Sequence, residues 1–166
     1  MRFTNPTSLR VLVAFGALLT TVGLLGTVPE TLVAAEPDKT ASPSTEAGFH
    51  WLVKQQKEDG SWDFNTGRNP STFSAPTVGT ALAVWPLLRA GQTPEKGAHA
   101  QSVAKGLAFI QSRMQFNEHG CHAPNEAGNM YGHAIITAAL CEAYSRTQDV
   151  KLKAVAQGAV DYIVHA

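Results

Sequence analysis

The chain has 166 residues, of which 44% are hydrophobic and 16% are charged, and its 13 basic and 13 acidic residues give a formal net charge of zero. This length fits a single folded domain at most. Because charge is sparse, balanced and without a basic run, the composition gives no reason to expect a nucleic acid partner. Two cysteines are too few to form a disulfide framework.

The first 35 residues have the order of a secretory signal peptide. Arg2 and Arg10 flank a short polar start, residues 11–28 are almost entirely apolar, and Val33-Ala34-Ala35 supplies small residues for cleavage. The alternative is an uncleaved membrane anchor, because the apolar stretch approaches the length that spans a bilayer. We therefore expect a periplasmic or secreted protein, or one held at the membrane only through this segment.

Residues 36–44 are rich in Pro, Ser, Thr and Asp, a composition typical of a disordered linker. The folded part is then residues 45–166, which is long enough to bury a core of modest size. Without Arg2, Arg10 and Glu30, 11 basic and 12 acidic residues remain, so the mature chain stays close to neutral.

The segment 47–62, AGFHWLVKQQKEDGSW, predicts the end of a helix followed by a turn. Gly60, preceded by an aspartate, tolerates the positive φ that such a turn requires. Trp62 can then fold back over the helix end, while the amide of Gln56 satisfies carbonyls left unpaired in the last helical turn and stacks beside the indole.

A shift of 53 residues aligns the folded part with itself without gaps. The pattern small-small-x-x-aromatic-aliphatic occurs around Trp51, Phe109 and Tyr162. A regular period near 50 residues is typical of a repeat architecture. The hydrophobic pattern predicts two buried helices, each followed by an amphipathic one, and it makes strands unlikely. The four expected helices are residues 77–90, 99–115, 131–147 and 150–165.

The segment around Trp51 and Trp62 resembles the QW motif of the prenyltransferase/squalene oxidase repeat family, with Trp51, Gln56, Gly60 and Trp62 at the matching positions. The second copy is degenerate, with Gly120-Cys121-His122 in place of Gly-x-Trp, and the third stops at Ala166. The resemblance implies the α/α toroid of squalene-hopene-type cyclases and protein prenyltransferases.

About two and a half helix pairs are visible, whereas the resemblance implies five to seven in a closed toroid. We therefore expect an incomplete toroid, apparently truncated at its C-terminus. Such an open array exposes an apolar end. Either further repeats follow, or the protein associates with itself.

The resemblance also implies an Asp-x-Asp-Asp motif for a class II cyclase, and this chain lacks one. Trp85 and Tyr144 are the inner-helix aromatics that could stabilise a carbocation, although ordinary helix packing explains them better.

Protein prenyltransferases bind zinc, and thiolate and imidazole are the ligands that zinc prefers. The metal candidates are Cys121, His122 and His133, with His119 and Glu126 as alternatives. Cys121 could instead be a small buried side chain or pair with Cys141, and His133 could bind a backbone carbonyl.

Paired carboxylates for glycoside hydrolysis would have to come from Asp59, Asp63, Glu118 and Glu126. All four lie in expected turns, where carboxylates more often cap the backbone or stay solvated.

The sequence thus predicts an all-α helix-hairpin repeat that acts as a binding or scaffold module, with no cofactor expected. The alternative is an enzyme related to terpenoid cyclases or prenyltransferases that acts on an apolar isoprenoid-type substrate, with zinc as its candidate metal and a site near residues 121–133. Export and the missing acid motif both favour the binding module.

Overall fold

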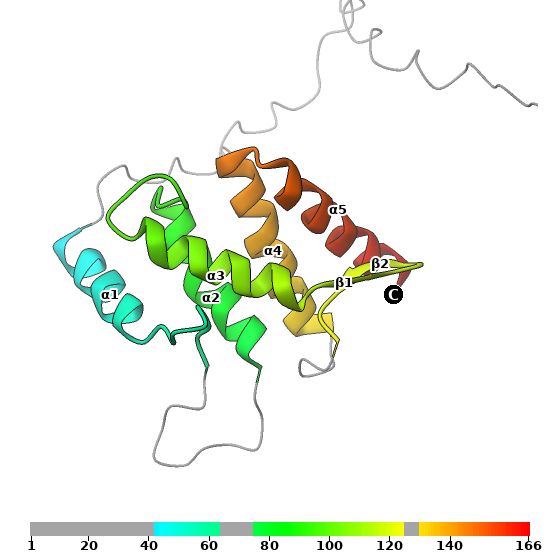
Figure 1. The fold of residues 1–166 in the computed structure, drawn as a ribbon, viewed down its shortest axis with the longest axis horizontal. Coiled ribbons are helices and arrows are strands. Elements are labelled where there is room, and N and C mark those ends of the chain that lie inside the picture. The colour runs from blue at the N-terminus through cyan, green and yellow to red at the C-terminus, as the bar shows by residue number, and fades with distance from the viewer. Residues whose placement is uncertain (1–41, 64–74, 125–129) are drawn as a thin grey trace, which may run out of the picture. The chain divides into compact units, whose positions relative to one another are not determined.

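The computed structural model describes residues 42–63, 75–124 and 130–166, all within a unit that spans Pro37–Ala166. These residues form five helices and one two-stranded hairpin (Figure 1). The helices are α1 (Pro43–Lys54), α2 (Pro76–Arg89), α3 (Ala100–Arg113), α4 (Met130–Thr147) and α5 (Val150–His165), and the strands are β1 (Gln115–Asn117) and β2 (Gly120–His122). The prediction of an all-α fold is confirmed.

None of the described helices has the length and apolar character needed to cross a membrane. The predicted signal peptide or anchor, residues 1–35, lies outside the described residues.

Helices α2 and α4 form the centre of the core. Helix α2 packs against both α3 and α4, and α4 packs against α2 and α5 (Figure 1). This placement agrees with the sequence pattern, since α2 and α4 are apolar around most of their circumference. The largest fully buried aliphatic side chains come from α2, α3 and α4: Val84, Leu87, Leu88, Val103, Ile110, Ile136 and Leu140.

Helix α1 begins inside the segment expected to be a linker. Ser42 is its N-cap, with a side-chain oxygen that accepts a hydrogen bond from the Thr45 amide at 3.2 Å, and Pro43 occupies the first helical turn. A serine cap followed by proline favours helix initiation, because proline has its φ preset and lacks a donor that would be unpaired there anyway. The sequence analysis assigned Ser42 and Pro43 to a disordered linker because the surrounding residues are rich in Pro, Ser and Thr.

The hairpin β1–β2 corrects the expectation that strands are absent. Its strands pair antiparallel, with Phe116 opposite Cys121. The turn is closed by Asn117, whose side-chain oxygen accepts from the His119 amide at 2.9 Å, and by Gly120 with φ of +137°. Strands of three residues are too short for the alternation that identifies a strand in a sequence, so hydrophobic patterning missed them.

Trp62 contacts three helices, whereas the segment 47–62 predicted only that it folds back over the end of one. Its indole N–H donates to the Leu52 carbonyl of α1 at 2.8 Å, and its amide donates to the Thr80 hydroxyl of α2 at 3.0 Å. The side chain is only 5% exposed, and its ring lies against Gly106 of α3. The predicted fold of Trp62 over the helix end is therefore confirmed.

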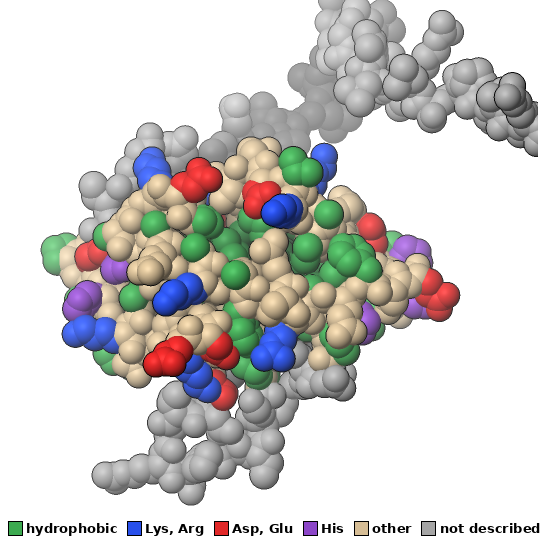
Figure 2. Space-filling model, in the orientation of Figure 1, with side chains coloured by type: hydrophobic (Ala, Val, Ile, Leu, Met, Phe, Trp, Pro, Cys, Tyr) green, Lys and Arg blue, Asp and Glu red, His purple; other side chains and the backbone are tan. Residues whose placement is uncertain are grey.

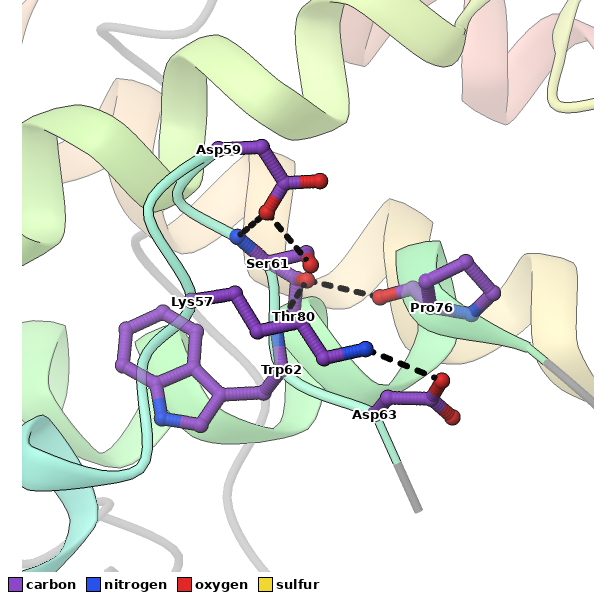
Figure 3. A network of polar contacts seen from close by, with 7 residues as sticks. All are labelled: Lys57, Asp59, Ser61, Trp62, Asp63, Pro76 and Thr80. Carbon is purple, nitrogen blue, oxygen red and sulfur yellow. Dashed lines mark hydrogen bonds and ion pairs between the residues drawn. The ribbon is translucent and has the colours of Figure 1, made fainter. Parts of the chain in front are cut away.

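The turn before Trp62 is fixed by its own polar groups (Figure 3). Asp59 accepts hydrogen bonds from the Ser61 amide at 3.0 Å and the Ser61 hydroxyl at 2.7 Å. Gly60 has φ of +88°, as predicted. Lys57 Nζ lies 3.2 Å from the Asp63 carboxylate, across the same turn.

Gln56 acts differently from the expectation. Helix α1 ends at Lys54, so Gln56 lies beyond its last turn. Its side-chain amide donates to the Gly60 carbonyl and to the Ser102 carbonyl of α3, each at 3.0 Å. Both amide hydrogens are thus used, one to close the turn and one to attach the turn to α3. The Ser102 partner is distant in sequence, which is why local reasoning did not find it.

Two turns approach neighbouring helices through glycine. A Cβ on Gly60 would lie 2.6 Å from the Lys105 carbonyl oxygen of α3, and a Cβ on Gly120 would lie 2.6 Å from the Tyr162 amide nitrogen of α5 and would also contact the Gly158 carbonyl. Such distances exclude any larger residue without movement of the backbone.

We expect Trp62→Ala to lower the free energy of unfolding by about 3 kcal/mol or more, because it removes a buried indole and leaves a cavity. Trp51→Ala is the matched control: Trp51 is 63% exposed, so its loss should change stability by no more than about 0.5 kcal/mol. Urea unfolding of both variants measures the difference, and equal effects would contradict the assigned role of Trp62.

Gly48 and Gly106 occupy the same position of the repeated pattern but have different surroundings. A Cβ on Gly106 would lie 2.5 Å from a Val84 methyl carbon and 3.1 Å from the Trp62 ring, whereas a Cβ on Gly48 would meet nothing within 4 Å. We expect Gly106→Ala to destabilise by about 1–3 kcal/mol through overpacking. Gly48→Ala should stabilise helix α1 by about 0.5–1 kcal/mol. Thermal melts that gave both changes the same sign would refute this distinction.

Candidate functional site

The predicted metal candidates gather around Tyr162 of α5. The His122 ring stacks on the Tyr162 ring with centroids 4.7 Å apart and an interplanar angle of 6°. The His133 ring meets Tyr162 edge-on, with centroids 5.0 Å apart and an angle of 61°. Cys121 is fully buried, with its Cβ against Gly158. The three candidates thus share one neighbourhood, but each of them packs against α5.

His133 is held by a backbone carbonyl, as the alternative interpretation proposed. Its Nε2 lies 2.9 Å from the Ala159 carbonyl oxygen, so this nitrogen carries the proton and donates. Thr137 in turn donates to the His133 carbonyl at 2.8 Å. A nitrogen that donates a hydrogen bond has no lone pair for a metal ion, so coordination through Nε2 would require this bond to break.

Within the described ranges, no group of three His, Cys, Asp or Glu side chains is placed to hold a metal ion. Glu126 lies outside these ranges. His119 is exposed, 3.5 Å from the Glu118 carboxylate, and its ring stacks on His165. The zinc hypothesis therefore stays a prediction, and the contacts of His122 and His133 give those residues a structural role.

Both cysteines are free thiols, so the Cys121–Cys141 disulfide is not formed in this structure. Burial raises the pKa of Cys121 to about 11 and also raises the pKa of Cys141. Cys121 is enclosed, whereas Cys141 is exposed on α4. A raised pKa leaves little thiolate at neutral pH, which disfavours a nucleophilic role for Cys121.

The described carboxylates considered for glycoside hydrolysis make local contacts within their turns. The hydrogen bonds from the Ser61 amide and hydroxyl hold the pKa of Asp59 below its usual value, so this group stays ionised at neutral pH and is poorly suited to donate a proton. Asp63 pairs with Lys57, and Glu118 lies beside His119. The candidate aromatics Trp85 and Tyr144 are partly buried and pack against the core.

A cleft of about 300 Å³ lies between the end of α1, the Trp62 turn and the first half of α2. It is lined by Trp51, Leu52, Gln55, Trp62, Asp63, Gly79, Leu82 and Ala83. Its volume is at the lower end for small-molecule sites, and its mixture of aromatic, aliphatic and a few polar groups is typical of them.

The sequence singled out Trp51 and Trp62 but did not predict the cleft that they line. Leu82 is 39% exposed on a helix that was expected to be buried, and the cleft depends on α1 and α2 meeting through contacts distant in sequence. The sequence signal that could have indicated the cleft was the presence of two tryptophans, one on each side of the turn.

No protein-family model, curated protein or solved structure matches the chain.

On the face shown in Figure 2, Lys, Arg, Asp and Glu side chains of the described residues lie interspersed. Opposite charges also meet directly, as in the pair of Arg89 with Glu142 at 3.7 Å, which joins α2 to α4. On this face, the charged side chains of the described residues therefore form no patch of a single sign.

We expect a maleimide reagent to label Cys141 and not Cys121 in the folded protein, because Cys141 is exposed and Cys121 is buried. Intact-mass analysis should show one adduct in buffer and two in denaturant. The variant Cys141→Ser should show none in buffer. Rapid labelling of Cys121 in the folded chain would contradict its burial.

Proposed function

We propose that this chain is a helix-hairpin repeat module of the α/α-toroid type, related to the prenyltransferase/squalene oxidase repeats, and that it acts as an exported binding or scaffold module. The cleft between α1 and α2 is its ligand site. The observation that carries the proposal is that the residues with candidate chemistry make structural contacts, while the cleft has exposed aromatic and aliphatic walls.

The repeat interpretation is supported by two similar contacts. The turn at Gly60 approaches the Lys105 carbonyl of α3, and the turn at Gly120 approaches the Gly158 carbonyl of α5. Lys105 and Gly158 are related by the same 53-residue shift that aligns the sequence with itself. An apolar helix followed by a half-exposed helix also occurs twice, as α2–α3 and α4–α5.

The preference for binding over catalysis is supported by how the candidate side chains are used. Asp59 and Asp63 stabilise a turn, His133 anchors α4 to α5, and Cys121 is enclosed with a raised pKa. A catalytic acid, base or nucleophile needs access to its substrate and a pKa suited to its task. These residues lack that access or that pKa, whereas the exposed indole of Trp51 offers a surface on which a ligand can pack.

A direct test is incubation of the purified chain with farnesyl diphosphate, geranylgeranyl diphosphate and squalene, with and without Zn²⁺, followed by mass spectrometry of the products. The binding-module proposal expects all three compounds to be recovered unchanged. A cyclised or transferred product would establish the enzyme alternative.

Zinc content supplies the matched control. We expect native mass spectrometry to show no bound zinc in the unmodified chain or in His133→Ala. Stoichiometric zinc that is lost in His133→Ala would instead support a metal enzyme and reject the structural role of His133.

A further inference from the structure

The walls of the cleft are unequal in polarity. Trp51, Leu52 and Trp62 form an aromatic and aliphatic side, to which α2 adds Leu82 and Ala83. In the part of the chain that the structure describes, the polar lining residues are Gln55, at the C-cap of α1, and Asp63, at the end of the turn. Trp51 is 63% exposed although it lines the cleft, so a broad indole surface is available to a ligand.

The polar residues argue against a wholly apolar ligand. Such a ligand would remove water from the Gln55 amide and from the surroundings of Asp63 without replacing their hydrogen bonds, and unreplaced hydrogen bonds cost free energy. A ligand with its own hydroxyl groups avoids this cost.

The charges argue against a cationic ligand. Among the described residues, Asp63 is the charged residue that lines the cleft, and its carboxylate already lies 3.2 Å from Lys57 Nζ. Because Lys57 balances this charge, an incoming ammonium group would gain little attraction and would be repelled by Lys57. A neutral ligand fits the balanced pair better.

A pyranose ring combines the two required properties. One face presents C–H groups, whose positive edges favour the negative face of an indole, and its rim carries hydroxyl groups that donate and accept hydrogen bonds. Resting on the proposed binding role, we propose that the cleft binds the ring of a neutral sugar. Trp51 stacks on its C–H face, and Gln55 and the Lys57–Asp63 pair bond to its hydroxyl groups.

The test titrates the purified full chain with the methyl pyranosides of glucose, galactose, mannose and N-acetylglucosamine, up to about 50 mM. Saturation-transfer NMR and indole fluorescence detect binding. Cyclohexanol, a ring without the hydroxyl pattern, and tetramethylammonium are the apolar and cationic probes. We expect at least one pyranoside to bind more tightly than both of these probes.

Trp51→Ala should weaken sugar binding about tenfold or more. Tyr131→Ala is the matched control, because Tyr131 is 77% exposed but lies in α4, outside the cleft lining; the affinity of this variant should not change. Both variants should retain the unfolding midpoint of the parent within a few degrees, so that lost binding reports the site and not the fold.

Absence of binding by all four pyranosides would overturn the proposal, and so would sugar binding that survives Trp51→Ala. Equal or tighter binding of cyclohexanol or tetramethylammonium would reject the sugar and leave the cleft as a binding site. These outcomes are separate from product formation on isoprenoids, which tests the proposed function itself.

Discussion

The structure depends on one buried indole. Trp62 bonds to the Leu52 carbonyl of α1 and to the Thr80 hydroxyl of α2, and it places its ring on Gly106 of α3. Thr80 donates in turn to the Pro76 carbonyl at 2.6 Å (Figure 3), which fixes the direction of the lone pair that Trp62 meets. Phe49 is the buried side chain of α1, and Leu52 and Val53 pack against the core while partly buried. The hydrogen bonds of Trp62 and Gln56 add to this packing, and Glu46 Oε1 lies 3.1 Å from His99 Nε2 as a further contact.

The second turn solves the same packing problem with different residues. Where Trp62 covers Gly106, a Cβ added to Gly158 would meet the Phe116 ring at 2.7 Å and the Cys121 Cβ at 2.8 Å. The aromatic group thus comes from the first strand of the hairpin, and the turn itself contributes only a small side chain. Under the proposed repeat relationship, this exchange would account for the replacement of Gly-x-Trp by Gly120-Cys121-His122. Phe116 stays largely exposed, whereas Trp62 is buried. The contact of the β1–β2 hairpin with α5 therefore excludes water less completely than the contact of Trp62 with α3.

The sequence was most informative where the controlling forces are local. Helix α5 matches residues 150–165, and the other predicted helices differ from the structure by at most two residues at either end, because apolar periodicity and turn residues act over a few positions. It failed where a partner is distant. The Ser102 carbonyl that receives Gln56 and the Ala159 carbonyl that receives His133 could not be inferred from spacing along one helix. For the candidate site, the residue types at Cys121, His122 and His133 suggested metal chemistry. Their packing role became visible only from the positions of Tyr162 and Gly158 on α5.

The location of the cleft follows from the way α1 is attached. Because α1 is fixed near its end by the Trp62 indole and the following turn, the remaining surfaces of α1 and α2 do not close on each other, and Trp51 and Leu82 are left facing a cavity. A ligand in this cavity would touch both helices, so its binding free energy would also favour the attached position of α1. Occupancy of the cleft and the docking of α1 would therefore be coupled. Trp62, which stabilises the fold, thus also determines where the cleft lies.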